Sequence, residues 1–172
     1  MPTSRISITE YAVLGILAED PTHGFAISKQ LEAGSDVGRV LTVRRPLVYR
    51  ALDRLVEAGY AAPAGTEKGE GPQRIIHRAT RSGRARLQSW LRQPVEHVRD
   101  LRIEFLLKLA ILRRSDQSPL DLIQAQRAAL DPKLEALDDS DVEADDHVEL
   151  WRQHNAAAAA AYLKDLESRH TL

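Results

Sequence analysis

Residues 44–60, RRPLVYRALDRLVEAGY, decide how the first half of the chain folds. Proline is favoured at the first position of a helix and glycine just after the last, so we expect one helix from Pro46 to the residue before Gly59. At helical spacing the segment has one apolar stripe, formed by Val48, Ala51, Leu52, Leu55 and Val56, which must pack against other helices. The remaining face points outward and carries Arg45, Tyr49, Arg50, Asp53 and Glu57.

Two shorter helices are expected before this one. Ser7 and Glu10 have capping-box spacing, which predicts a helix over residues 8–19, and Asp20-Pro21 ends it because the residue before proline disfavours the helical region. Residues 22–24 are interpreted as a turn. Apolar residues from Phe25 to Leu31 then predict a second helix, which Gly34 closes.

A basic hairpin is expected after the third helix. Residues 60–65 and 73–80 are candidate strands around a glycine-rich turn, and Arg74, Ile76 and Arg78 alternate along one face of the second strand. A further helix leads through Trp90 to Pro94. Three helices followed by a basic hairpin is the element order of a winged helix-turn-helix, in which the third helix lies in the DNA major groove and the wing reaches the backbone.

The rest of the chain is predicted to be helical. The apolar residues of 95–114 are too many for a solitary surface helix, and a further helix from Ser118 should be kinked or split at Pro132, with Asp131 capping the second piece. An acidic connection, residues 138–146, precedes a last helix with an alanine run, Ala156–Ala161. We therefore expect a mainly α fold: a winged helix-turn-helix domain with a two-stranded wing at residues 1–92, and a helical dimerisation domain at residues 93–172.

Charge is unevenly divided along the chain. The net charge is −1, but residues 1–94 hold 14 Lys/Arg against 9 Asp/Glu, whereas residues 95–172 hold 10 against 16. The absence of cysteine excludes disulfides, thiolate catalysis and zinc fingers. No segment approaches the roughly 18 uninterrupted apolar residues of a membrane span, and the apolar run of residues 12–18 has no signal-peptide flanks, so we expect a cytoplasmic protein without a membrane partner.

The candidate DNA-binding residues are the cations and the tyrosine of the third helix and the wing: Arg44, Arg45, Tyr49, Arg50, Lys68 and Arg74. The planar guanidinium group of arginine can bind a guanine edge or a phosphate, and a tyrosine hydroxyl can bind a phosphate oxygen. The alternative is that these are solvated charges on an amphipathic helix and an ordinary hairpin. Asp53 would repel phosphates unless Arg50 or Arg54 neutralises it.

Other chemistry is weakly supported. The acidic segment lacks the glycine and terminal glutamate of a calcium loop and is interpreted as a solvated linker, and His147 and His154 are two helical turns apart, too far to bind one metal by themselves. No catalytic motif is found, so we expect no enzyme, no metal and no cofactor. Trp90 and Trp151 are either core residues, the favoured alternative, or the wall of a site for a small aromatic effector, for which Trp151 is the candidate.

Four sequence motifs resemble the PadR family of bacterial transcriptional regulators. They are Gly24–Ile27, Val48–Leu55 followed by Gly59-Tyr60, Arg78–Arg84, and Leu101–Lys108, the last of which is similar to the start of that family's C-terminal domain. The resemblance implies a homodimer joined by its C-terminal helices, two winged helices on a pseudo-palindromic operator, and usually repression. It also places Tyr49 near phosphate.

This chain departs from the family pattern at several positions that bear on which operator it reads: Phe25, Pro46-Leu47, Asp53 and His77. Our hypothesis is a homodimeric repressor that binds double-stranded operator DNA and is released by an effector. The alternative from another class is a winged-helix scaffold that binds a protein. The salt dependence of binding distinguishes the two hypotheses, because DNA binding weakens steeply as the salt concentration rises and binding through an apolar protein interface does not.

Overall fold

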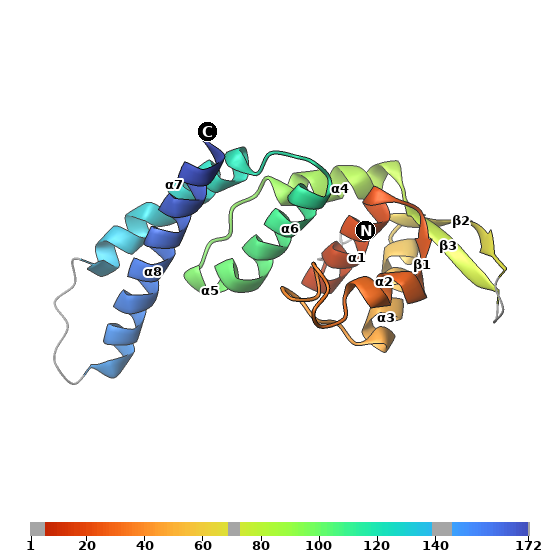
Figure 1. The fold of residues 1–172 in the computed structure, drawn as a ribbon, viewed down its shortest axis with the longest axis horizontal. Coiled ribbons are helices and arrows are strands. Elements are labelled where there is room, and N and C mark those ends of the chain that lie inside the picture. The colour runs from red at the N-terminus through yellow and green to blue at the C-terminus, as the bar shows by residue number, and fades with distance from the viewer. Residues whose placement is uncertain (1–5, 69–72, 139–145, 172) are drawn as a thin grey trace. The chain divides into compact units, whose positions relative to one another are not determined.

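The computed structural model describes residues 6–68, 73–138 and 146–171. Its contacts divide the chain into two compact units, residues 1–91 and 92–172 (Figure 1). The predicted acidic connection lies outside the described residues except for Asp138 and Asp146, at its two ends.

The N-terminal unit is built on three helices, α1 (Ile8–Glu19), α2 (Gly24–Gln30) and α3 (Arg45–Glu57). The predicted capping box of α1 is confirmed: the Glu10 amide donates to Ser7 Oγ at 3.3 Å, and the Ser7 amide donates to Glu10 Oε2 at 2.8 Å. Pro46 is the second residue of α3, one place later than predicted, and Gly59 has a φ of +72° just beyond its end.

Three strands form one antiparallel sheet in the order β1-β3-β2: β1 (Thr22–His23), β2 (Ala61–Glu67) and β3 (Arg74–Ala79). The hairpin of β2 and β3 is the predicted wing. Its register places Glu67 opposite Arg74, with an irregularity between Pro63 and Gly65. Residues 22–24 were expected to turn, but Thr22 and His23 pair with His77 and Ile76 and so join the wing to the start of α2. Two residues have no readable period, so this strand could not be found from the sequence.

The core of the N-terminal unit surrounds α1, which packs against α3 and α4 (Arg81–Leu91) (Figure 1). Residues 10–17 of α1 are all buried. Val48, Ala51, Leu52 and Leu55 are the buried residues of α3, as its apolar stripe predicts. Tyr11 stacks on Trp90 with ring centroids 4.1 Å apart, which confirms the core alternative for Trp90. The predicted mainly helical fold class is confirmed, with β1 as an additional strand.

All the described elements of the C-terminal unit are helices, joined by non-helical segments such as residues 92–97 and 115–119. Its elements are α5 (Val98–Asp100), the π-helical segment η1 (Leu101–Phe105), α6 (Leu106–Arg114), α7 (Leu120–Asp138) and α8 (His147–His170). Pro132 lies inside α7, so of the two predicted alternatives, a kink or a split, the split is wrong. Asp131 does not cap a second helix; its carboxylate is 3.2 Å from Arg127 of the previous turn. Packing along α8 supports α7 through the proline, which overrides local propensity.

Two buried polar side chains anchor the segment that precedes α5. Gln126 is fully buried and binds both backbone groups of Val95: its amide donates to Val95 O at 2.9 Å, and its carbonyl accepts from Val95 N at 2.7 Å. The Lys108 ammonium donates to Gln93 O at 2.7 Å and pairs with Glu104 at 2.9 Å. Burial lowers the pKa of Lys108 below its ordinary value, and the hydrogen bond to Glu104 opposes this shift. These bonds satisfy polar groups that are costly to bury unpaired.

None of the helices in the described part of the chain is long and apolar enough to cross a membrane.

Candidate nucleic-acid interface

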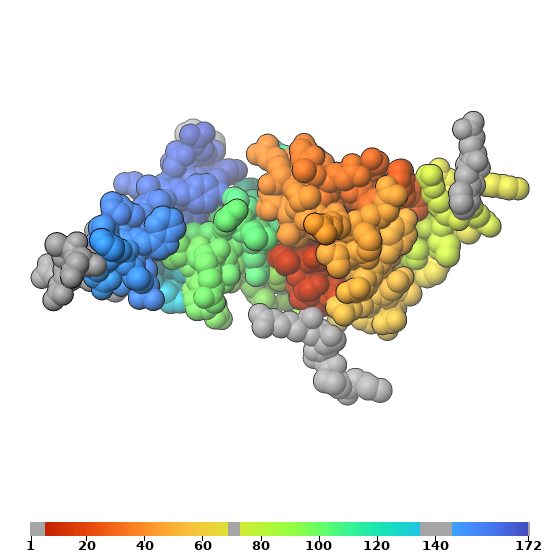
Figure 2. Space-filling model, turned by 90° about the horizontal axis from the view of Figure 1, so that it is seen from below, coloured from red at the N-terminus to blue at the C-terminus, as the bar shows by residue number. Residues whose placement is uncertain are grey.

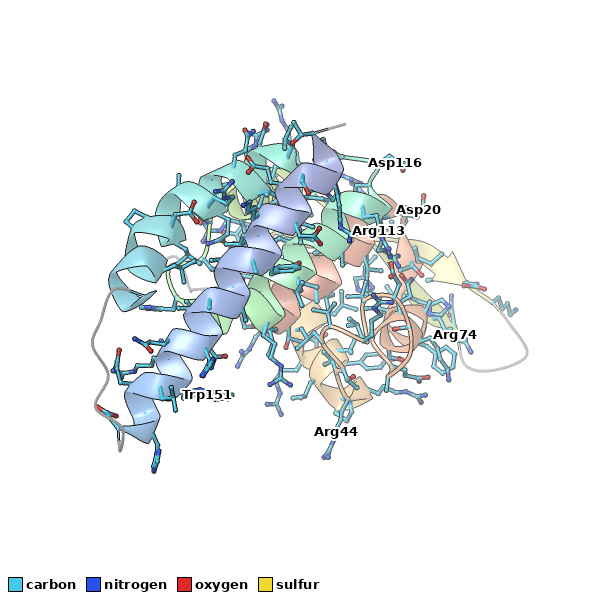
Figure 3. All side chains as sticks on the ribbon, turned by 60° about the vertical axis from the view of Figure 1, so that its left-hand side comes forward. Asp20, Arg44, Arg74, Arg113, Asp116 and Trp151 are labelled. Carbon is cyan, nitrogen blue, oxygen red and sulfur yellow. The ribbon has the colours of Figure 1, made fainter. Side chains whose placement is uncertain are left out.

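The first turns of α3 present the predicted basic and aromatic residues to solvent. Arg44 is the N-cap residue, and Arg45, Tyr49 and Arg50 are all exposed. Among the residues that the structure describes, no carboxylate lies within ion-pair distance of Arg44, Arg45 or Arg50. Figure 2 looks onto this face of the N-terminal unit, with α3 in orange and the strands of the wing in yellow beside it. Figure 3 shows Arg44 pointing away from the helices of this unit. The end of α3 therefore carries unneutralised positive charge.

Tyr49 is held in place by the backbone of α2. Its side chain is 42% exposed, yet one edge of its ring lies on Gly24, where an added Cβ would be 2.7 Å from Tyr49 Cε1. Gly24 thus leaves room for the ring, and the ring orientation sets where the hydroxyl points. This contact gives a physical reason for a glycine at the start of α2.

Gly24→Ala is expected to displace Tyr49 and to weaken DNA binding at least about tenfold, because a hydrogen bond to a charged group contributes about 1.5–3 kcal/mol. The free energy of unfolding should change little, because an exposed ring can move and alanine is the better helix former. Fluorescence anisotropy and thermal melting measure the two quantities.

Tyr49→Phe is the matched variant for Gly24→Ala, since it removes the hydroxyl and leaves the ring. It should reproduce the loss of affinity. Full affinity in both variants would show that Tyr49 makes no contact with DNA.

The wing brings a second set of charges near α2. Arg74, the first residue of β3, and Lys68, just after β2, are both exposed. His23 Nδ1 accepts a hydrogen bond from the Ala26 amide at 3.0 Å, so in the neutral ring the proton is on Nε2, which faces Glu67 Oε2 at 3.3 Å. Arg74 Nη1 is 3.4 Å from the same nitrogen. His23 therefore caps α2, faces Glu67 of β2 through its ring and pairs with Ile76 of β3 through its backbone.

Phe25 is the residue around which the cations of three elements gather. Its ring is partly buried, and the guanidinium carbons of Arg45 and Arg74 are 4.8 Å and 4.9 Å from its centroid. Lys29 Nζ is 5.7 Å from the centroid and also pairs with Glu32 at 3.1 Å. Cations over an aromatic face are attracted by the ring quadrupole. Phe25 is thus in contact with one arginine of α3 and one arginine of the wing.

Sequence reasoning missed three features of this surface. Phe25 was expected in the second helix and as a departure from the family pattern, and His23 was expected in a turn. Their contacts with Arg74 cross 49 and 51 positions of sequence, which no periodic pattern reveals. Leu47 and Ile75 are 45% and 53% exposed beside the arginines, where apolar side chains can contact thymine methyl groups. Finally, Arg54 pairs with Glu10 at 3.5 Å, so it is not the residue that neutralises Asp53.

Trp151 belongs to the other unit and is 69% exposed on α8 (Figure 3), so the core alternative is wrong for the single chain. A cavity of about 310 Å³ lies between α7 and α8, but Trp151 does not line it; its lining includes Arg127, Asp131, Leu134 and Lys164. Within the ranges 6–68, 73–138 and 146–171, no group of three His, Asp or Glu side chains is placed to hold a metal ion.

The order of helices, the paired wing and the exposed cationic end of α3 define the N-terminal unit as a winged helix-turn-helix domain. Residues 13–89 match the model of the transcriptional regulator PadR-like family, which confirms for the N-terminal unit the resemblance that the sequence motifs predicted. The match covers α2, α3 and the wing in full, and most of α1 and α4.

Several solved structures resemble the chain. One is Bacillus subtilis PadR in complex with operator DNA, at 22% identity, with 97% of this chain and 98% of that chain covered and a TM-score of 0.48. Another is smu.1704 from Streptococcus mutans, at 24% identity, with 51% and 77% covered and a TM-score of 0.40. No curated protein sequence matches the chain. The family assignment rests on the match over residues 13–89.

Proposed function

We propose that this transcriptional regulator is a homodimeric repressor that binds a pseudo-palindromic DNA operator through α3 and the wing. The observation that carries the proposal is the cationic surface of Arg44, Arg45, Arg50 and Arg74, which has no carboxylate at ion-pair distance among the described residues. A folded protein seldom gathers charges of one sign without a partner, because their mutual repulsion is unfavourable. A DNA backbone supplies the opposite charge.

The exposed residues of α3 suit the major groove. In helix-turn-helix proteins the first residues of the recognition helix contact base edges, and arginine binds guanine O6 and N7 in a bidentate manner. Arg50 and the apolar Leu47 have this position on α3. Tyr49, Lys68 and Arg74 are assigned to phosphates, which set the orientation of the domain on DNA.

Dimerisation is assigned to α8. Large apolar side chains are exposed along this helix beside its alanine run: Val148, Leu150, Trp151 and Tyr162. A surface of this kind is normally covered by a partner, and a two-fold pairing of identical chains is the commonest arrangement. Such a dimer would present two copies of α3 to half-sites one helical turn apart, about 34 Å.

The same surface of α8 is assigned to a small aromatic effector that releases the repressor from DNA. The exposed Trp151 ring can form one wall of a site for a flat ligand, and a second protomer would supply the rest of that site. An effector bound there would favour a dimer whose two α3 helices no longer match the half-sites. The regulator acts on DNA, so we place it in the cytoplasm.

Selection from a random duplex library, followed by fluorescence anisotropy at 50 mM and 200 mM salt, tests the proposal. Enrichment of a sequence with two-fold symmetry is expected. Its affinity should fall at least about a hundredfold between the two salt concentrations, since each neutralised phosphate releases counterions. Light scattering on the same sample should give the mass of a dimer.

A scrambled duplex of the same composition is the control, and it should bind weakly at either salt concentration. Enrichment of no sequence by a folded dimer would overturn the proposal and favour a scaffold that binds a protein. A monomeric mass with specific DNA binding would overturn the dimer alone.

A further inference from the structure

Phe25 links the recognition helix to the wing through two arginines. Arg45 comes from the first turn of α3, and Arg74 comes from the first residue of β3. Each guanidinium carbon lies within 5 Å of the Phe25 centroid, so the two cations are no more than about 10 Å apart, close to the Debye length at 0.1 M salt. The two charges therefore act on one another and on any anion near them.

We propose that Phe25 joins Arg45 and Arg74 into a single phosphate-binding unit, which holds one DNA backbone phosphate between α3 and the wing. The inference rests on the proposed function and deepens it. Phe25 is a positioning residue in this scheme, since it acts through the two arginines and needs no contact with DNA.

The chemistry of the cluster favours an anion over an internal ion pair. The ring attracts both guanidinium groups but accepts none of their N–H donors in a conventional hydrogen bond. Those donors remain available, in a planar fork that matches phosphate oxygens. In the described part of the chain, neither arginine has a carboxylate at ion-pair distance. An anion between the two would relieve their repulsion.

The remaining neighbours are already engaged. Lys29 is the most distant of the three cations from the ring, and it is bound to Glu32. Glu67 stands opposite Arg74 in the wing, but its carboxylate faces His23 at 3.3 Å. His23 Nε2 lies 3.4 Å from Arg74 Nη1, but in the neutral tautomer given above both nitrogens carry protons, so His23 accepts no hydrogen bond from Arg74. The Arg74 guanidinium therefore contacts the Phe25 ring and keeps its donors for an anion.

A double-mutant cycle with the full-length protein and its selected duplex tests the coupling. Arg45→Ala and Arg74→Ala should each weaken binding about tenfold, and the double variant should lose much less than the product of the two losses, because either change breaks the same unit. When Phe25→Leu is present, the unit is already broken. The loss of affinity caused by the two arginine changes together should then equal the product of the losses caused by each. Phe25→Leu alone should weaken binding about fivefold.

Phe25→Tyr is the conservative variant and should restore both the affinity and the coupling, because it keeps the ring. Two measurements without DNA exclude a merely structural role for Phe25. Thermal melting of Phe25→Leu should match that of the original protein within a few degrees. The side-chain protons of Arg45 and Arg74 should show ring-current shifts in the nuclear magnetic resonance spectrum, and these should disappear in Phe25→Leu.

Single methylphosphonate substitutions in the duplex locate the phosphate, since each removes one backbone charge. One position in each half-site should weaken binding to the original protein and have no effect on either Arg45→Ala or Arg74→Ala. Different positions for the two arginines, or losses that multiply in the original background, would overturn the inference and leave the proposed function standing. Failure of the original protein to bind any duplex would overturn both.

Discussion

Replacement of Gly83 by alanine is expected to lower the free energy of unfolding of the N-terminal unit by about 3 kcal/mol, the upper end of the usual cost of overpacking. Gly83 is buried in the first turn of α4, and an added Cβ would lie 2.1 Å from the carbonyl oxygen of Tyr60. That oxygen accepts a hydrogen bond from the Thr80 amide at 2.9 Å. The obstacle is therefore backbone that cannot move without breaking another bond.

Thr80 connects the end of α3 to the start of α4 through two hydrogen bonds of its hydroxyl group. Its hydroxyl donates to Gly59 O at 2.7 Å and accepts from the Gly83 amide at 3.0 Å, in the manner of a helix N-cap. The end of α3, the end of β3 and the start of α4 thus meet at one point. Gly83→Ala should consequently disturb the wing as well as the stability, and weaken DNA binding further.

Urea denaturation followed by circular dichroism measures the effect of Gly83→Ala, with Ser82→Ala as the matched control. Ser82 is exposed, and its hydroxyl donates to Gly59 O at 3.0 Å, so its loss should cost about 1 kcal/mol or less. The transition of the N-terminal unit is the one to compare, because two units need not unfold together. Equal stability of the two variants would contradict the close approach of α4 to Tyr60.

Local signals in the sequence were sufficient for α1 and for the outward face of α3, whereas α2 ends at Gln30, before the Gly34 that was expected to close it. The bounds of α1 were predicted correctly because a capping box starts the helix and Asp20-Pro21 ends it. The outward face of α3 was predicted correctly because one apolar stripe fixes the register of the whole helix. Both signals depend on residues within about four positions of one another, so they can be recognised in the sequence without knowledge of tertiary contacts.

Features that depend on distant contacts were missed. β1 exists because Thr22 and His23 find partners in β3, and α7 continues through Pro132 because α8 packs along it. The cluster at Phe25 depends on Arg74, a residue of the wing. In the candidate site, the residue types were predictable, but the arrangement that makes two arginines neighbours was not.

Arg50→Ala and Arg45→Ala are expected to weaken operator binding by different routes. Arg50 lies one turn into α3 and is assigned to a base edge, so its loss should cost about 1–3 kcal/mol and relax the preference for one base of each half-site. Arg45 is assigned to a phosphate. Its loss should weaken binding to operator and scrambled duplex alike, and reduce the slope of log affinity against log salt by about one per protomer.

Fluorescence anisotropy distinguishes the roles of the two arginines when the operator, its single-base variants and a scrambled duplex are compared. Light scattering should show that both variants remain dimers. Arg86→Ala is the matched control, because Arg86 is an exposed arginine on α4, which packs on α1 and β3. It removes the same charge from the domain and should change operator affinity by less than about twofold, since screening weakens a charge that touches no phosphate. An equal loss from Arg86→Ala would mean that net charge alone attracts DNA. Full affinity in Arg45→Ala and Arg50→Ala would move the interface away from α3.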